Sequence, residues 1–184
     1  MLRNTDLSWG APAKLLHWVV AALVFAQIAL GWAAVSWRLS PTKLDLFVWH
    51  KSTGMLVLLL MVVRVAWRAA NTAPALPAGM RPLERRAAGA SHLLFYVLLL
   101  LMPMTGWIVN SAENIPLRMF WQIPLPNLVG PDEATALAAA RVHLALFVAL
   151  SLLLAVHIGA ALRHHFLKRN DVLVRMLPGT RSGS

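Results

Sequence analysis

The sequence predicts an all-α membrane protein, a bundle of four transmembrane helices, and three observations lead to this fold class. Hydrophobic residues make up 59% of the 184 residues and charged residues only 13%, outside the range of ordinary soluble domains. The apolar residues form four runs, each long enough to cross a bilayer at about 1.5 Å of rise per residue. The arginines lie mainly at the borders of these runs. We expect one integral membrane domain over residues 1–184.

The first three apolar runs are separated by polar segments. Leu15–Trp37 follows a polar N-terminal segment without a small-residue cleavage site, which does not resemble a cleaved signal peptide. Leu46–Trp67 is followed by a linker with three prolines and two glycines, which ends that helix and precedes the third run, His92–Val109. Pro103 lies inside the third run, where it is expected to kink the helix.

The fourth run, Leu137–Leu162, follows the longest connection. Residues 110–135 contain four prolines and the pair Phe120–Trp121. Aromatic residues beside prolines at the end of a span are typical of a short segment lying in the membrane interface. We therefore expect such a segment between the third and fourth helices.

The distribution of lysine and arginine predicts how the chain crosses the membrane. Twelve of these residues lie on the side that holds both termini and the second loop, and five lie on the other side. By the positive-inside rule, both termini are cytoplasmic. The net charge of +10 is mostly this topology pattern, together with attraction to anionic lipid. The expected partner is the lipid bilayer rather than a nucleic acid.

Four histidines lie within the apolar runs, where an imidazole is costly and tends to mark a functional site. His143 and His157 are fourteen residues apart, which places them on one helix face and about 21 Å apart in depth. His50 begins the second run near the outer surface, and His17 begins the first run near the cytoplasmic surface. The histidines therefore form two layers, His50 with His143 outside and His17 with His157 inside.

Each layer offers two imidazoles from different helices, as a bis-histidine haem requires. The sequence thus predicts that the four-helix bundle encloses two stacked b haems. Gly31, fourteen residues after His17, lies on the same face at the depth of the outer layer, where a porphyrin could approach the backbone. Ordinary helix packing explains such a glycine equally well.

Other interpretations of the histidines are weaker. One alternative is that the histidines are buried imidazoles that hydrogen-bond to neighbouring helices. Zinc would need a compact cluster of three or four ligands, whereas the two layers lie some 20 Å apart. The absence of cysteine excludes disulfides, iron–sulfur clusters, thiolate sites and covalent haem attachment. No serine–histidine–acid arrangement and no glycine-rich phosphate loop is visible.

Four segments carry a resemblance to a known family: KLLHW, FVWHKSTGMLVLLLMVVRVAWR, SHLLFYVLLLLMPMTGW and VHLALFVALSLLLAVHIGAALRHHF. They resemble the bacterial cytochrome b561 family over nearly the whole chain, and within it the superoxide oxidases most. The resemblance implies non-covalent haem b at His17, His50, His143 and His157, and participation of His164 at a quinone site. It further implies superoxide as the periplasmic electron donor, ubiquinone as the acceptor and a bacterial inner-membrane location.

Further polar residues are expected near the cytoplasmic layer. His164 lies seven residues after His157, on nearly the same face and about 10 Å closer to the cytoplasm, where a quinone head group would meet the inner haem. Arg64, fourteen residues after His50, is placed either to pair with a haem propionate or to extend to lipid. His92 opens the third run and is either a proton relay or an ordinary interfacial histidine.

Basic residues also lie near the outer layer. Lys43, Lys51 and Arg141 are expected to steer an anion such as superoxide toward the outer haem. Asp132 and Glu133 lie on the same side and weaken this expectation.

Two other functions remain open. A haem-bearing anchor subunit would accept electrons from a docked dehydrogenase or a soluble redox partner, as relatives in the wider superfamily do. A structural bundle without haem would use the four histidines only for packing. The small size of the chain and the lack of an extra domain favour a protein that works alone.

Overall fold

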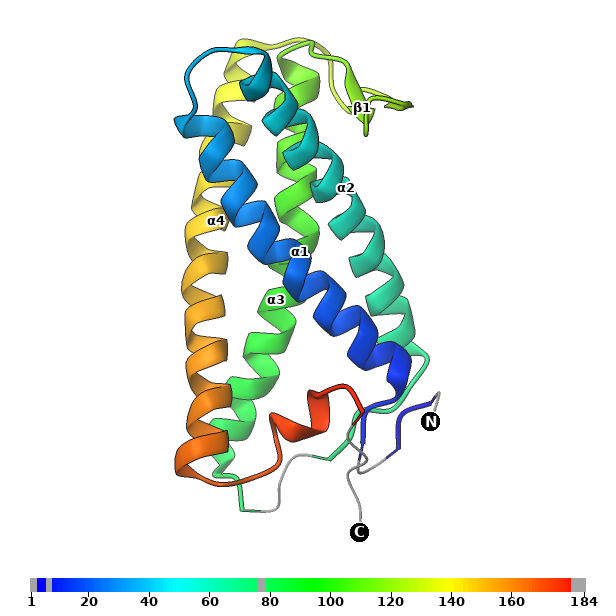
Figure 1. Cartoon of the computed structure of the whole chain (residues 1–184), viewed down its shortest axis with the longest axis vertical. Helices are drawn as coiled ribbons and strands as arrows, with labels where there is room; N and C mark the ends of the chain where they lie inside the picture. Colours follow the sequence, from blue (N-terminus) through cyan, green and yellow to red (C-terminus); the bar gives the residue numbers. More distant parts are fainter. Residues whose placement is uncertain (1–2, 6–7, 76–78, 180–184) are drawn as a thin grey trace.

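The fold consists of four long helices, shown in a computed structural model that describes residues 3–5, 8–75 and 79–179 (Figure 1). The helices are α1 (Ala11–Ser36), α2 (Pro41–Ala69), α3 (Pro82–Ala112) and α4 (Glu133–Leu162). All four are long and apolar enough to cross a membrane, which confirms the predicted fold class of a multi-pass helical bundle. The chain then forms a π-helical turn at Arg163–Leu167 and a 3₁₀ turn at Val174–Met176.

Each helix begins before the apolar run that predicted it, because caps rather than hydrophobicity set the first turn. A proline occupies the first turn of α1, α2 and α3, where its fixed φ and missing N–H suit the helix start. Ser40 caps α2 by accepting a hydrogen bond from the Lys43 N–H. Asp132 caps α4 by accepting one from the Thr135 N–H at 2.8 Å. This bond lowers the pKa of the Asp132 carboxyl, because it favours the charged form.

The helices pack as two pairs, α1 with α2 and α3 with α4, and α2 joins the pairs by packing against α3 (Figure 1). Among these four helices, which are described throughout, α4 packs closely against neither α1 nor α2. Pro103 lies inside α3 without interrupting it. Large apolar side chains such as Trp32, Leu39 and Leu152 remain exposed around the bundle, where lipid is the expected solvent.

A small apolar core holds the middle of the bundle together. Its buried members come from all four helices: Val20, Val24, Val57, Met61, Leu99 and Leu150. On α1 and α2, the core residues follow His17 and His50 in the sequence. The core therefore lies between the two predicted histidine layers.

The connection between α3 and α4 contains a β-hairpin, which the prediction of a short interfacial segment did not include. Strands β1 (Leu117–Met119) and β2 (Ile123–Leu125) pair antiparallel. Strands this short escape a prediction from alternating hydrophobicity, since the alternation needs about four residues to be recognised.

The turn of this hairpin carries backbone strain. Phe120 and Trp121 have φ values of 48° and 62°, and the Gln122 N–H donates to the Met119 carbonyl oxygen at 3.0 Å. Positive φ at both central residues matches the twist of the strands, but it costs about 1–2 kcal/mol per residue without glycine. The Trp49 ring on α2 contacts both aromatic rings, with centroids 5.6 and 5.4 Å away. These contacts offset part of the strain and hold the turn against α2.

Three buried polar side chains tie the hairpin to the helices. Ser52, Asn110 and Ser111 are each at most 1% exposed. The Ser52 hydroxyl oxygen accepts from the Phe120 N–H at 2.7 Å, and that of Ser111 accepts from the Leu128 N–H at 3.1 Å. Asn110 hydrogen-bonds to the loop that follows α3. Because these side chains are buried away from water, each hydrogen bond satisfies a polar group that would otherwise be unpaired.

The opposite end of the bundle holds both termini (Figure 1). The C-terminal segment folds back onto α1, where Trp18 Nε1 donates to the Met176 carbonyl oxygen at 2.7 Å and Lys14 Nζ to that of Leu177 at 3.1 Å. Glu84, in the first turn of α3, accepts hydrogen bonds from basic side chains at the end of α4. These contacts close the end of the bundle nearest the termini.

Replacing Asn110 with alanine should destabilise the protein by about 1–3 kcal/mol, because Lys51 and the Ile115 carbonyl would lose their hydrogen bonds to this buried side chain. The free energy of unfolding, measured by titrating denaturing detergent into mixed micelles, provides the test. Gln122→Ala in the exposed hairpin is the matched control and should change little. Equal stabilities of the two variants would show that the buried network does not hold the hairpin.

Candidate functional site

The inner layer brings together His17 on α1 and His157 on α4. Their ring centroids lie 6.4 Å apart with an interplanar angle of 62°. Arg64 donates from Nη2 to His17 Nδ1 at 3.0 Å. Since a guanidinium cannot accept, His17 carries its ring proton on Nε2 in this arrangement. Two further rings face His157, those of Phe95 at 5.1 Å and His92 at 6.2 Å.

The outer layer brings together His50 on α2 and His143 on α4, with ring centroids 6.5 Å apart and planes at 78°. His143 Nδ1 lies 3.1 Å from the Met102 carbonyl oxygen and 3.0 Å from Thr105 Oγ1. The Thr105 hydroxyl itself donates to Met102 at 2.8 Å, so its oxygen accepts from His143. The ring proton is therefore on Nδ1, which leaves Nε2 with a free lone pair, as in metal-ligating histidines.

The outer imidazoles lie directly against glycine backbone. A Cβ atom at Gly31 would approach His50 Cε1 to 3.0 Å, and one at Gly106 would approach His143 Cε1 to 3.3 Å. The sequence pointed to Gly31 but missed Gly106, although Gly106 follows His92 by the same fourteen residues that separate Gly31 from His17. Only glycine, which has no side chain, leaves room for these rings beside the backbone.

Another glycine gives room to a polar side chain. Gly54 lies beside the amide of Gln27, which donates to the His50 carbonyl oxygen at 2.8 Å. His50 Nδ1 is buried and has no hydrogen-bond partner among the described residues. A buried imidazole without a protein partner is unusual, which makes a further ligand of this ring chemically reasonable.

The distances between ring centres in both layers match those expected for two imidazoles on one metal. Imidazole nitrogens bind first-row metals at about 2.0–2.1 Å, and a ring centre lies about 1.1 Å behind its nitrogen, so two opposed imidazoles have centres roughly 6.3 Å apart. The observed distances of 6.4 and 6.5 Å agree with this value. Paired neutral imidazoles are a donor set that suits haem iron.

Comparison with known proteins identifies the family. The model of the prokaryotic cytochrome b561 family matches residues 8–179. The chain belongs to the prokaryotic cytochrome b561 family. Members of this family bind b-type haem and transfer electrons across a membrane, which agrees with the paired histidines described above.

Several cytochrome b561 relatives match over nearly their whole length. The chain is 31% identical to cytochrome b561 homolog 2 of Escherichia coli K12, over 95% of this chain and 93% of the relative. It is 26% identical to the probable superoxide oxidase CybB of Yersinia pestis, over 90% and 93%. It is also 29% identical to cytochrome b562 of Cereibacter sphaeroides, over 88% and 90%.

The basic residues predicted near the outer layer have different surroundings. Lys51 donates from Nζ to Asn110 Oδ1 and is attracted by the Glu113 carboxylate. Lys43 donates to the Val35 and Trp37 carbonyl oxygens and so caps the end of α1. Arg141 is exposed on α4, two residues before His143.

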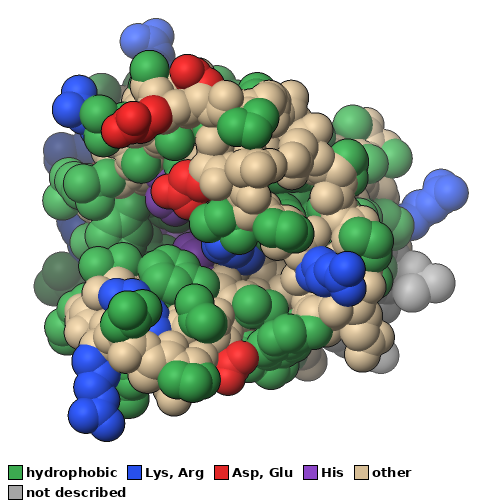
Figure 2. Space-filling model, turned by 90° about the horizontal axis from the view of Figure 1, so that it is seen from above, with side chains coloured by type: hydrophobic (Ala, Val, Ile, Leu, Met, Phe, Trp, Pro, Cys, Tyr) green, Lys and Arg blue, Asp and Glu red, His purple; other side chains and the backbone are tan. Residues whose placement is uncertain are grey.

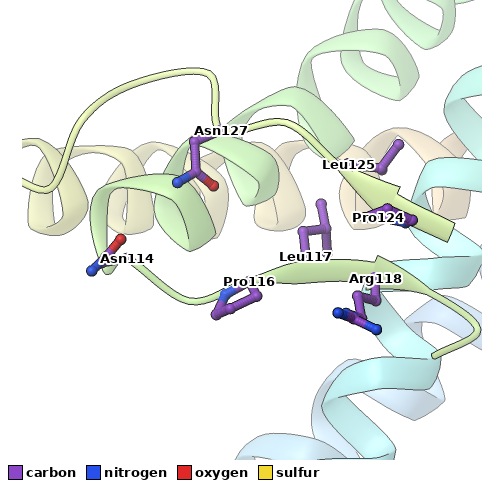
Figure 3. A pocket seen from close by; sticks show the side chains of 7 residues that line it. All are labelled: Asn114, Pro116, Leu117, Arg118, Pro124, Leu125 and Asn127. Atoms are coloured by element: carbon purple, nitrogen blue, oxygen red, sulfur yellow. The ribbon is translucent and has the colours of Figure 1, made fainter. Parts of the chain in front are cut away.

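Seen from this end, histidine side chains show in a hollow between acidic and basic side chains (Figure 2). The two histidines of the outer layer, His50 and His143, are each partly exposed. A separate pocket of about 270 Å³ lies on the hairpin, where Asn114, Arg118 and Asn127 contribute to its lining (Figure 3). The residues that line it include none of the predicted site residues.

His164 lies past the end of α4 in the π-helical turn and is only 7% exposed. The Lys168 N–H donates to the Arg163 carbonyl oxygen at 3.0 Å, the bond that widens this turn. Nδ1 of the His164 ring lies 2.8 Å from Asn170 Nδ2. Sequence reasoning missed Asn170, because no spacing rule connects a residue beyond a helix end to a ring within it.

Replacing Gly31 with valine should lower the haem content of the purified protein, because the new side chain would displace the His50 ring. Gly159→Val on α4 is the matched control, since a Cβ there meets no atom within 4 Å. Haem per protein would be measured by the pyridine haemochrome method. Full haem content in Gly31→Val would show that His50 does not need its place against the α1 backbone.

Proposed function

We propose that the protein binds two b haems, the inner one between His17 and His157 and the outer one between His50 and His143. The matched ring distances of 6.4 and 6.5 Å are the observation that carries this proposal. His92 lies at a similar distance from His157, but α3 and α4 pack against each other, whereas α1 and α4 do not. A porphyrin needs such a separation of the helices that hold it, which favours His17.

Backbone and side-chain groups of the chain itself prepare the ligands. Met102 and Thr105 keep the proton of His143 on Nδ1, so that Nε2 is ready to bind iron. Ligation through Nε2 of His17 would move that ring's proton to Nδ1 and release Arg64 from its bond. The freed guanidinium would then hold a haem propionate by charge-assisted hydrogen bonds. When bound, the haems supply one-electron carriers at two depths of the membrane.

We further propose that superoxide is the electron donor at the outer end and ubiquinone the acceptor at the inner end. Two superoxide anions are each oxidised to O₂, and the two electrons with two protons reduce one ubiquinone to ubiquinol. The relative named as a probable superoxide oxidase supports this assignment, as does the partial exposure of His50 and His143. The positive-inside pattern favours cytoplasmic termini in a bacterial inner membrane, with the protons taken from that side.

The side chains have separate tasks in this scheme. Arg141 and Lys51 lie near the outer layer and would attract the anion. His164, buried at the opposite end, would hydrogen-bond to the quinone. The single domain over residues 1–184 would then carry both half-reactions.

The second candidate is a haem-bearing electron-transfer subunit that accepts electrons from a dehydrogenase or a soluble redox protein. Acidic side chains lie among basic ones on the outer end in Figure 2, and Lys43 donates hydrogen bonds to carbonyl oxygens at the end of α1. A surface with charges of both signs suits a protein partner with a complementary charge pattern better than a small anion. Reduction of the haems by superoxide without any partner protein separates the two candidates.

Substitution of the shared helix should remove one haem at a time. His143→Ala should lose the outer haem and keep the inner one, whereas His157→Ala should do the reverse, because α4 supplies one ligand to each. Haem per protein and redox titration would identify which haem remains. His165→Ala, outside both layers, is the control and should keep both. Two bis-histidine haems in His143→Ala would contradict the assignment.

Superoxide-driven haem reduction should occur with the purified protein alone and should slow as salt is added. Screening acts because the Debye length falls to about 10 Å at roughly 0.1 M ionic strength. Stopped-flow measurement should show Arg141→Gln to be slower than the wild type at low salt, while Arg86→Gln at the opposite end is unchanged. A rate that does not vary with salt would contradict anion steering, and no reduction at all would favour the protein-partner candidate.

A further inference from the structure

His164 is set apart from the other histidines. His164 is 7% exposed and is the most buried of the seven histidines, all of which lie in the part of the chain that the structure describes. It lies in a π-helical turn, a distortion that is frequently found at functional sites. Neither histidine layer uses its ring.

The hydrogen bonds of Asn170 fix the tautomer of this ring. The Asn170 side-chain oxygen accepts from the Val172 N–H at 3.4 Å, so the amide nitrogen Nδ2 faces His164. That nitrogen donates to His164 Nδ1 at 2.8 Å, and the Asn170 N–H donates to the His164 carbonyl oxygen at 3.1 Å. Because Nδ1 accepts, the ring proton resides on Nε2.

The segment that carries Asn170 is held at several points. Arg175 forms an ion pair with Asp171 at 2.7 Å and donates to the Ala75 carbonyl oxygen at 2.8 Å. Met176 accepts from Trp18 on α1 at 2.7 Å. The C-terminal segment is thereby fastened to α1 and to the residues after α2, and Asn170 is held in place relative to His164.

We propose that Asn170 is a positioning residue that keeps His164 in the Nε2–H tautomer, so that this ring donates a hydrogen bond to a carbonyl oxygen of a quinone. The inference rests on the proposed function, in which a quinone is reduced at this end of the bundle. It adds the residue that sets the direction of the hydrogen bond. A ring with its proton on Nδ1 would offer the same oxygen a lone pair instead, and the interaction would be lost.

Asn170→Asp provides the sharpest test, because a carboxylate only accepts and therefore draws the ring proton to Nδ1. Nitrogen-15 spectra of the haem-loaded, dithionite-reduced protein, labelled in histidine, should show His164 as Nε2–H in the wild type and Nδ1–H in the variant. His164→Gln identifies the resonance by its loss. Asn71→Asp, at the same end of the bundle, controls for the added charge and should leave the spectrum unchanged.

The same variants should separate in kinetics. Oxidation of the reduced haems by a short-chain ubiquinone at saturating concentration should slow by about tenfold in Asn170→Asp, the effect of one lost hydrogen bond. Haem content and reduction by superoxide should match the wild type. His164→Leu should slow the same step at least as much, and His165→Leu should not.

Each outcome decides a separate point. An unchanged His164 tautomer in Asn170→Asp would overturn the positioning role. A reversed tautomer with normal quinone reduction, while His164→Leu is slow, would also overturn it and leave the quinone site intact. Normal quinone reduction in His164→Leu would instead show that the proposed quinone site is wrong.

Discussion

The burial of imidazoles in an apolar bundle is the constraint on which the arrangement depends. Each ring inside the membrane must find a partner, because an unpaired polar group in hydrocarbon costs several kcal/mol. His143 is satisfied by Met102 and Thr105, and His17 by Arg64. His50 Nδ1 has no partner among the described residues. The fold thus provides a hydrogen-bond partner for one nitrogen of His17 and of His143, and it places each of these rings beside the other histidine of its layer.

The packing of the helices is also related to the positions of the histidines. α4 carries a histidine of each layer, yet it packs closely against neither α1 nor α2, where the partner histidines lie. The apolar core, the α2–α3 contact and the hairpin hold the two helix pairs together instead. Glycines 31 and 106 let the outer rings lie against backbone. Stability is therefore supplied by contacts around the histidines rather than by close packing of α4 against α1 or α2.

The sequence predicted the helices and the pairing of the histidines because the geometry of an α-helix is fixed. A helix rises by a fixed amount and turns by a fixed angle per residue, so the spacing of His143 and His157 determines both their depth and their common face. The partner on each facing helix then follows from the direction in which that helix crosses the membrane. The structure brings together His17 with His157 and His50 with His143, as this reasoning expected.

The features that the sequence did not reveal depend on contacts between distant residues. Phe120 enters its strained turn because Ser52 and Trp49 hold it, and they lie some seventy residues earlier. Likewise, Asn170 meets His164 only because the C-terminal segment folds back. Helical periodicity says nothing of such contacts, since they arise where the chain leaves the helices. The same limitation affected the helix ends, which capping residues extend beyond the apolar runs.

The distance between the irons of the two proposed haems tests whether each histidine pair holds one haem. Pulsed dipolar electron paramagnetic resonance on the oxidised protein measures it, since low-spin bis-histidine iron is paramagnetic. Fourteen residues of helix separate His143 and His157 on α4, so the proposed pairing predicts two low-spin centres about 20 Å apart. A single centre, or two centres at a clearly different distance, would contradict the assignment of one histidine pair to each layer.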